Sequence, residues 1–416
     1  MHFIKRFFSQ EIKNIYHLAQ AVLANFFYGF PSEKIKIIGI TGTNGKTTTC
    51  QMVSAILEET GKKIAMASTI NFKIGARVWV NTTKYTTLSP WKVQKFLRQA
   101  VSEGCEFCVL ETSSHSLDQF RVWGVKYAAA AITNVTREHL DYHKTMENYR
   151  KAKLKLFKVS PIIVVNGDME NPDEFLQYTN ETQLVYSTKH PDADVLAKDM
   201  KIGLHESRFS VKGVNFELYL PGIFNAENAL AAIAVGVSQK ITLESMAKAL
   251  KKIKGVAGRL ESIENTRGMN IIVDYAVTPD SLEKLYEYLA SAKKENSKII
   301  AVFGSCGERD RGKRPIMGEI VSRYADTIII TNEDPYFEDP QQIIEEVASG
   351  VKNKKEGENF WKIFDRREAI GKALNLAKQD DMVVVTGKGA EEIMLVGEKR
   401  IPWNDKKVIL EELEKI

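Results

Sequence analysis

The sequence predicts an α/β protein in which mostly parallel sheets carry helices on both faces. From Lys34 onward, short β-rich runs alternate with helical periods, in the order KIKIIGIT, KIAMAST, FCVLETS, AAAAITNV and PIIVVNG. After GRLESIEN the alternation begins again with NIIVDYA, KIIAVFGS, DTIIITNED and MVVVTGKG. Such alternation is typical of parallel strands joined by crossover helices. Two α/β domains are therefore expected, joined near Gly255.

These boundaries divide the chain into three parts. Residues 1–33 are predicted to form an amphipathic helical segment, residues 34–257 the first α/β domain and residues 258–416 a second, Rossmann-like one. A chain of 416 residues exceeds what one hydrophobic core usually supports, which agrees with this division. We expect the two α/β domains to close over their ligands, with the joint near Gly255 as the hinge.

The N-terminal segment carries apolar residues at helical spacing, namely Phe8, Ile12, Ile15, Ala19 and Val22. We expect this stripe to pack against the following domain. The alternative is a basic amphipathic helix on a membrane surface, and the sequence leaves that contact open. No run of about 18 apolar residues is present, so a membrane-spanning helix is not expected.

Composition excludes several classes of partner. The 58 basic and 53 acidic residues give a formal net charge of only +5, too weak an excess to indicate a nucleic-acid partner. The four cysteines are too few for a disulfide framework in a chain of this length, which favours a reducing cytoplasm. We expect a monomer that acts on small molecules.

The segment GTNGKTT after KIKIIGIT has the features of a phosphate-binding loop. Its sequence pattern is unusual, because Ile40 lies at the position where the common phosphate-binding loop has its first glycine. With a helix beginning near Lys46, backbone N–H groups and the helix N-terminus would face one anion. Lys46 could neutralise the β and γ phosphates, and the Thr47 hydroxyl could bind Mg²⁺. The first domain is therefore predicted to be a P-loop ATPase domain that uses ATP and Mg²⁺.

More polar side chains follow later strands of the same sheet. Glu111 follows FCVL, while Asn134 and His139 lie in TNVTREHLDYH. The carboxyl ends of parallel strands converge on the ligand crevice, so we expect these residues to meet the phosphate loop. A carboxylate and an imidazole there could bind a metal. His115 and His143 are interpreted as surface or core residues.

A series of motifs then resembles one enzyme family. In order, the chain reads GITGTNGKTTT, ETSSHSLDQFR, TNVTREHLDYHKTMENYRKAKLKLF, GIFNAENALAAIA, GRLE, VDYAVTPDSLEKL, VFGSCGERDRGKRPIMG, NEDPYFEDP and GKGAEE. Together these resemble the Mur ligases, specifically the MurE type, which make the tripeptide of peptidoglycan precursors. The resemblance implies that ATP phosphorylates a carboxylate and that the amine of an amino acid attacks the acyl phosphate. Such a reaction depends mainly on positioning and charge neutralisation.

The resemblance implies roles for individual residues around the nucleotide. Lys46, Glu111, His139 and Lys153 would be catalytic. Thr47 and Glu111 would hold the Mg²⁺ on the nucleotide, and His139 with a carbamylated Lys153 a second metal, since a neutral buried amine can take up CO₂. The nucleotide would contact Gly42, Thr43, Asn44, Gly45, Lys46, Thr47, Thr48, Asn134, Asn225, Asn228 and Arg259.

The same resemblance implies two substrate regions. The muramoyl dipeptide would lie on Thr86, Thr87, Ser113, Gln119 and Arg121, with Arg121 paired to its carboxylates. The incoming amino acid would meet Arg309, Glu333, Asp334, Pro335, Tyr336, Gly387 and Glu391. There Glu391 could bind an ammonium and Arg309 a carboxylate.

The sequence departs from the family's pattern in three places. Only about 35 residues precede the phosphate loop. The family's domain that binds the uridine diphosphate sugar would need roughly a hundred, so a lipid-linked muropeptide is an alternative acceptor. Tyr336 replaces the arginine that would hold the distal carboxylate of diaminopimelate, so L-lysine is weakly favoured over meso-diaminopimelate. Val277 and Ala390 stand where the family has histidines, with no consequence that the sequence defines.

Two other functions remain alternatives. One is a glutamate-adding ligase of the folylpolyglutamate or cyanophycin kind, against which TTLSP and SSHSLDQFR count because they match the muropeptide side. The other is a non-catalytic partner that binds ATP. Lys46, Glu111, His139 and Lys153 argue against it, because a binding module would need no second metal site.

Overall fold

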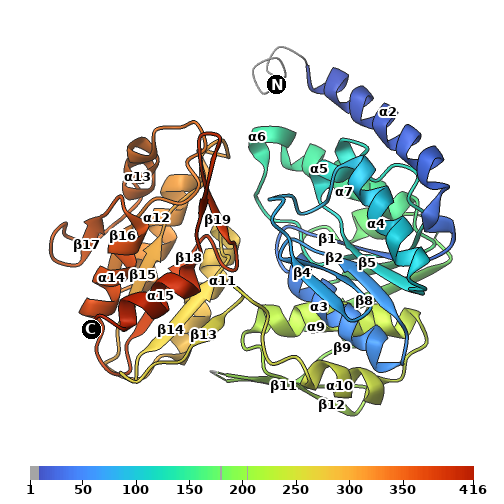
Figure 1. Cartoon of the computed structure of the whole chain (residues 1–416). Coiled ribbons are helices and arrows are strands. Elements are labelled where there is room, and N and C mark those ends of the chain that lie inside the picture. Colours follow the sequence, from blue (N-terminus) through green and yellow to red (C-terminus); the bar gives the residue numbers. More distant parts are fainter. Residues whose placement is uncertain (1–8, 179, 204) are drawn as a thin grey trace.

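The computed structural model describes residues 9–178, 180–203 and 205–416. It confirms the predicted fold class, since two α/β units with largely parallel sheets lie side by side (Figure 1). No helix in these residues is long and apolar enough to cross a membrane.

A nine-stranded sheet forms the centre of the first unit, in the order β4-β3-β2-β5-β1-β6-β7-β8-β9. Strand β3 pairs antiparallel with β2 and with β4, and all other neighbours are parallel. The strands are β1 (Lys36–Thr41), β2 (Ile64–Ala67), β3 (Asn71–Ile74), β4 (Arg77–Val80), β5 (Phe107–Glu111), β6 (Tyr127–Ile132), β7 (Ile162–Asn166), β8 (Thr182–Ser187) and β9 (Val195–Leu196).

Helices cover both faces of this sheet because its central strands are apolar on both sides. In β1, Ile37 faces one hydrophobic core and Ile38 the other. One face carries α3 (Lys46–Glu59), α9 (Ile223–Ser238) and α10 (Leu243–Lys251). The other face carries α4 (Pro90–Ser102), α5 (Ser114–Asp118) and α7 (Met146–Lys158). The shorter helices are η1 (Pro31–Glu33), α6 (Leu140–His143) and α8 (Asp173–Leu176).

A small antiparallel sheet, which the sequence analysis did not predict, lies beside α10. It consists of β10 (Lys198–Ile202), β11 (Ser207–Val211) and β12 (Val214–Leu218). Phe209 and Phe216 stack on its buried face, with ring centroids 5.4 Å apart. This face extends the hydrophobic core under α9.

The second unit is a six-stranded sheet in the order β13-β14-β18-β15-β16-β17, parallel except for the β13–β14 pair. Its strands are β13 (Glu261–Ile263), β14 (Asn270–Asp274), β15 (Ile299–Phe303), β16 (Thr327–Ile330), β17 (Phe360–Lys362) and β18 (Met382–Thr386). The helices that flank it are α11 (Pro279–Ala292), α12 (Lys313–Tyr324), α13 (Pro340–Ala348), α14 (Arg366–Leu376) and α15 (Asp405–Leu413). A hairpin of β19 (Ile393–Val396) and β20 (Lys399–Pro402) lies toward the first unit (Figure 1).

The connection between the units is fixed by a glycine. Gly258 has φ +63°, and a Cβ atom there would lie 2.1 Å from the Ala390 backbone nitrogen. Only glycine fits such a close approach in the left-handed region. The chain therefore enters the second unit directly against the segment that follows β18.

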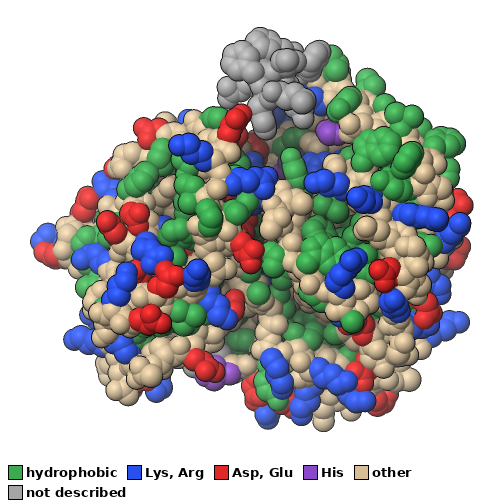
Figure 2. All heavy atoms as spheres, viewed as in Figure 1, with side chains coloured by type: hydrophobic (Ala, Val, Ile, Leu, Met, Phe, Trp, Pro, Cys, Tyr) green, Lys and Arg blue, Asp and Glu red, His purple; other side chains and the backbone are tan. Residues whose placement is uncertain are grey.

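The N-terminal helix α2 (Gln10–Tyr28) does not use the predicted stripe. Ile12 and Ile15 are exposed, and Phe8 lies outside the described residues. The buried face is Ala21, Ala24 and Asn25, whose small side chains allow close approach to the domain. Asn25 fixes the contact, because its Nδ2 donates to the Trp123 carbonyl at 2.9 Å. The prediction about the packing stripe was therefore wrong, and apolar side chains of α2 gather on the surface (Figure 2).

Candidate active site

A cleft of about 290 Å³ lies between the two units and is lined by residues of both. The first unit contributes the phosphate loop and the carboxyl ends of β5 and β6. The second contributes the segments after β14, β15, β16 and β18. The cleft thus lies at the edge where parallel strands of open α/β sheets bind ligands.

The phosphate loop connects β1 to α3 and needs its two glycines. Gly42 has φ +150° and Gly45 has φ +81°. A Cβ atom on Gly42 would lie 1.8 Å from Thr133 Oγ1, and one on Gly45 2.1 Å from Asn228 Oδ1. The loop is held from the neighbouring strand, since the Asn44 backbone N–H donates to Asn134 Oδ1 at 2.9 Å.

Lys46 begins helix α3, as predicted, and its side chain folds over the loop. Its Nζ donates to the carbonyls of Gly42 and Thr43 at 3.1 and 2.8 Å. Burial lowers the pKa of Lys46, and the negative charge of Glu111 opposes that effect. The ammonium therefore lies within the loop that would receive phosphate.

Thr47 and Glu111 form an oxygen-rich group at the start of α3. Thr47 Oγ1 lies 3.1 Å from each carboxylate oxygen of the buried Glu111. Thr69 completes the group, donating to Glu111 from its backbone N–H at 2.7 Å and from Oγ1 at 2.9 Å. Sequence reasoning missed Thr69, although its place directly after β2 was a signal. Hydroxyl and carboxylate oxygens at a phosphate site are the ligands that Mg²⁺ prefers.

His139 lines the same cleft, with φ +58° at the start of α6. Its ring lies 4.6 Å from that of His115, centroid to centroid. Burial and then His115 lower the pKa of His139 well below its usual value, which favours a neutral imidazole. His143 is a core residue, with Nε2 3.0 Å from Ser114 Oγ. Among the described residues, no group of three or more His, Cys, Asp or Glu side chains could hold a metal by itself.

Lys153 lies on α7 behind the phosphate loop, outside the lining of the cleft. Its side chain is buried, and Nζ donates to the Gly42 carbonyl at 2.6 Å. Burial, and then the charge of Lys46, lower the pKa of Lys153 well below its usual value. The residue is therefore suited to be a neutral amine, unlike the exposed lysines of the same helix.

The second unit reaches the phosphate loop at two points. Arg259 Nη2 lies 3.4 Å from Thr47 Oγ1, and its guanidinium stacks 4.5 Å from the centroid of the Tyr275 ring. Asn44 Nδ2 donates to Asp280 Oδ2 at 2.9 Å, at the beginning of α11. Asn225 and Asn228 also line the cleft, joined by a bond of 3.3 Å from Asn228 Nδ2 to Asn225 Oδ1.

The residues predicted for the dipeptide form a continuous network. Thr87 Oγ1 donates to the Glu111 carbonyl at 2.8 Å and accepts from the Ser113 backbone N–H at 2.9 Å. Arg121 donates to the Thr87 carbonyl at 3.2 Å and to Gln119 Oε1 at 2.7 Å. Thr86 joins through Thr69 Oγ1, 3.1 Å away, and is the only one of the five that lines the cleft. The other four are connected to the cleft residue Glu111 by these hydrogen bonds.

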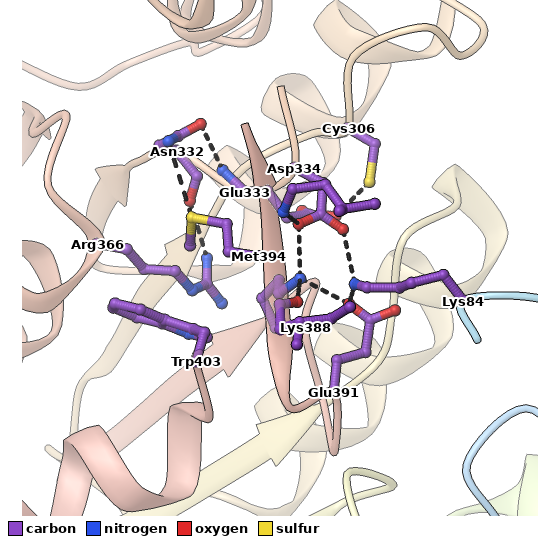
Figure 3. Close-up of polar contacts among 12 residues, drawn as sticks. Lys84, Cys306, Asn332, Glu333, Asp334, Arg366, Lys388, Glu391, Met394 and Trp403 are labelled. Atoms are coloured by element: carbon purple, nitrogen blue, oxygen red, sulfur yellow. Dashed lines mark hydrogen bonds and ion pairs between the residues drawn. The ribbon is translucent and has the colours of Figure 1, made fainter. Parts of the chain in front are cut away.

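Three of the residues predicted for the amino acid, Glu333, Asp334 and Glu391, line the cleft and lie close together (Figure 3). Asp334 and Glu391 share the buried Lys388, whose Nζ lies 2.7 Å from an oxygen of each. Burial alone would raise the pKa of Asp334, but Lys388 and Lys84 outweigh it and lower that pKa. Sequence reasoning missed Lys388, although it lies within the GKGAEE motif.

Glu333, Gly387 and the Arg309–Tyr336 pair lie beside these carboxylates. Glu333 Oε1 accepts from Cys306 Sγ at 2.8 Å, and burial raises the pKa of Glu333. A Cβ atom on Gly387 would lie 2.3 Å from Glu333 Oε2, so glycine is needed there. The Arg309 guanidinium lies 5.4 Å from the centroid of the Tyr336 ring. Pro335 connects Asp334 to Tyr336 but does not line the cleft.

Two lysines join the units in ways that sequence reasoning did not find. Lys313, from the motif RDRGKRP, donates to Glu138 Oε1 of the first unit at 2.9 Å. Lys84, from the loop before α4, donates to Asp334 Oδ2 of the second unit at 2.9 Å. Both pairings join residues far apart in the sequence, so no local pattern indicates them.

Comparison with protein families identifies both units. Residues 40–236 match the Mur ligase middle domain, and residues 258–389 match the Mur ligase glutamate ligase domain.

Curated proteins of similar sequence cover nearly the whole chain. A protein of Clostridium tetani named UDP-N-acetylmuramoyl-L-alanyl-D-glutamate--2,6-diaminopimelate ligase is 39% identical over 404 residues, which are 96% of this chain and 81% of that protein. A UDP-N-acetylmuramyl-tripeptide synthetase of Roseiflexus is also 39% identical, over 93% of this chain and 80% of its own length.

Solved structures share the fold. A structure titled UDP-N-acetylmuramoyl-L-alanyl-D-glutamate--2,6-diaminopimelate ligase is 31% identical, with a TM-score of 0.62 over 92% of this chain and 78% of its own. A folylpolyglutamate synthase of Mycobacterium tuberculosis has a TM-score of 0.71 at 17% identity, over 89% of this chain and 92% of its own. This likeness concerns the fold alone.

Proposed function

Since the chain belongs to the Mur ligase family of ATP-dependent amide ligases, we propose that it adds a diamino acid to UDP-N-acetylmuramoyl-L-alanyl-D-glutamate in peptidoglycan precursor synthesis. The proposal rests above all on one observation. The phosphate loop with Thr47 and Glu111, and the acidic pair Asp334 and Glu391, line a single cleft. ATP and an amine-bearing substrate can thus meet within one enclosure.

Two groups of residues in and beside the cleft have separate tasks. Lys46 and Arg259 place positive charge at the phosphate loop, where they would stabilise the charge that develops when a carboxylate takes the terminal phosphoryl group. Arg121, which donates to the Thr87 carbonyl, would hold a carboxylate of the dipeptide. The amine of the amino acid then attacks the acyl phosphate, forming the amide and releasing phosphate.

Mg²⁺ fits the oxygen atoms of Thr47 and Glu111. The two side chains lie 3.1 Å apart and face the loop, and a magnesium ion usually takes only one or two protein ligands beside phosphates and water. When bound there, Mg²⁺ would supply charge neutralisation for the phosphates.

A carbamylated Lys153 also fits its surroundings. A lysine with a lowered pKa offers the free amine that reacts with CO₂, forming a carbamate and releasing one proton. The positive charge of Lys46 would favour the resulting anion. Together with His139, the carbamate would serve a second metal.

For the amino acid we propose L-lysine. Asp334 and Glu391 suit a distal ammonium, and Tyr336 cannot offer a guanidinium to a distal carboxylate. The second candidate is meso-diaminopimelate, which is favoured by Arg309 beside Tyr336 and by the names of the similar proteins. We further propose that the enzyme is a cytoplasmic monomer.

A lipid-linked muropeptide is the second candidate for the acceptor. It is favoured by the apolar side chains that α2 exposes, namely Ile12, Ile15, Tyr16, Leu23, Phe26 and Phe27. Such a surface suits an acceptor held at a membrane.

One assay tests the proposal. Phosphate release from ATP is measured with UDP-N-acetylmuramoyl-L-alanyl-D-glutamate and either L-lysine or meso-diaminopimelate, and the mass of the product is determined. A tripeptide product from the wild type, absent in Lys46→Met, supports the ligase and identifies the amino acid. Absence of product with both amino acids, in protein that binds ATP, contradicts the proposed acceptor.

A further inference from the structure

Lys84 of the first unit inserts its ammonium group between two carboxylates of the second. Its Nζ lies 2.9 Å from Asp334 Oδ2 and 2.5 Å from Glu391 Oε2 (Figure 3). The Lys84 side chain is only 12% exposed, so this contact is largely closed to water. The two carboxylates are those that face an incoming amino acid in the proposed function.

The loop between β4 and α4 is built to present Lys84. The residue has φ +60°, a left-handed conformation that side-chain-bearing residues disfavour. Asn81 holds the loop, since its Nδ2 donates to the Ser68 and Tyr85 carbonyls at 2.8 and 3.0 Å. Thr83 Oγ1 donates to Asn81 Oδ1 at 2.6 Å. These three hydrogen bonds around a strained residue indicate that the loop holds Lys84 in a fixed position.

Lys388 and Lys84 differ in how firmly they belong to the acidic pair. Lys388 is fully buried within the second unit, and its Nζ donates to Asp334, Glu391 and the Ile393 carbonyl, which uses all three of its hydrogens. Lys84 comes from the other unit and keeps some contact with solvent. Lys84 is therefore the cation that another ammonium can replace.

The charge of the pocket requires that any replacement also be a cation. Asp334 and Glu391 pair with the two lysines, and Oε2 of the neighbouring Glu333 has no hydrogen-bond partner in the described part of the chain. Removing Lys84 without compensation would leave buried carboxylates underpaired, which is strongly unfavourable. A substrate ammonium restores the charge, whereas an apolar side chain does not.

We propose that Lys84 is an internal competitor that occupies the Asp334–Glu391 pair until the distal ammonium of the incoming amino acid displaces it. The inference rests on the proposed function, in which this pair binds the amino acid. The distal amine is the one concerned, because the attacking amine must be uncharged and must lie at the acyl phosphate. Lys84 thereby selects for amino acids with a second ammonium group, since an amino acid without one cannot replace Lys84 between the carboxylates.

The test measures binding and turnover in Lys84→Met. Calorimetry with a non-hydrolysable ATP analogue gives the Kd of L-lysine and of meso-diaminopimelate, and steady-state assays give KM. We expect the Kd and KM of the diamino acid that the wild type uses to fall about threefold or more, because the competitor is gone. The gain should lie in KM and not in kcat, and L-norleucine, which lacks the distal ammonium, should gain no affinity.

Two variants separate competition from loss of contact between the units. Arg400 Nη1 donates to the Thr82 carbonyl at 3.1 Å, so Arg400→Met removes another contact of the same loop and leaves the acidic pair occupied. Its Kd for the diamino acid should equal that of the wild type. Lys84→Arg keeps a cation and should not bind the diamino acid more tightly than the wild type. Melting temperatures establish that all three variants fold.

The outcomes distinguish the inference from the function. If the wild type turns over the diamino acid and Lys84→Met has the same or a higher KM for it, the competitor role alone is overturned. The same conclusion follows if Arg400→Met gains as much affinity for the diamino acid as Lys84→Met does. Failure of both wild type and Lys84→Met to bind or use either diamino acid overturns the proposed function together with the inference.

Discussion

Lys313 Nζ of the second unit donates to Glu138 Oε1 of the first at 2.9 Å, and both side chains are buried. The same ammonium donates to the Val277 carbonyl at 2.8 Å. Glu138 is the neighbour of His139, so this ion pair joins α12 to the segment that carries a predicted metal ligand. The position of the second unit over the cleft is thus tied to the site itself.

Lys313→Met should open the cleft. Removing one partner of a buried ion pair costs about 3–5 kcal/mol, because the other charge is left unpaired. The units can relieve this cost by separating, which returns Glu138 to water. We expect a larger radius of gyration than in the wild type by X-ray scattering, measured with an ATP analogue. Lys352→Met, which removes an exposed ion pair with Glu319, is the control and should leave the radius unchanged.

Glu111→Gln should raise the Mg²⁺ requirement. The amide keeps the shape of the side chain but loses the charge that a cation between Thr47 and the phosphates would need. We expect the Mg²⁺ concentration for half-maximal phosphate release to increase about tenfold or more. The matched control is Glu106→Gln, whose carboxylate lies exposed beside Lys62. An unchanged magnesium dependence would show that the cation binds elsewhere.

Lys153 should carry a carbamate in the active protein. With ¹³C-labelled bicarbonate, the wild type is expected to show a carbamate carbon signal by NMR that is absent in Lys153→Met. Activity should fall about a hundredfold or more in the variant, the loss typical of a group that stabilises charge in the transition state. Lys151→Met, on the exposed face of the same helix, should retain both signal and activity. The same signal in both variants would place the modification on another lysine.

Tyr336→Arg should shift amino-acid preference toward meso-diaminopimelate. The guanidinium would form a bidentate hydrogen bond with the distal carboxylate of diaminopimelate, a group that L-lysine lacks. The ratio of kcat/KM for diaminopimelate to that for lysine should rise about tenfold, as for one charged hydrogen bond. Tyr336→Lys supplies a positive charge without bidentate geometry and should raise this ratio by a smaller factor. A ratio that does not change would mean that Arg309, beside Tyr336, already serves this role.

The sequence was sufficient for much of the fold and for the nucleotide end of the site. The alternation of apolar runs predicts the two α/β units, and the phosphate loop is predicted because Gly42 and Gly45 meet a backbone requirement that no other residue fulfils. Thr47 and Glu111 come together because Thr47 follows β1 and Glu111 ends the neighbouring parallel strand β5. Resemblance then added Lys153, whose place on a basic helix gave no signal of its burial.

The strands, the crossover helices and the glycine-dependent loop can be predicted from the sequence alone, because they depend on backbone sterics and on periodicity within short segments. That α2 buries Ala21 and Ala24 instead of its larger apolar residues depends on tertiary packing, since close approach to the domain favours small side chains. The same holds for the pairing of Lys84 with Asp334 and of Lys313 with Glu138. Such pairs depend on how two separately folded units meet, and no pattern within either unit contains that information.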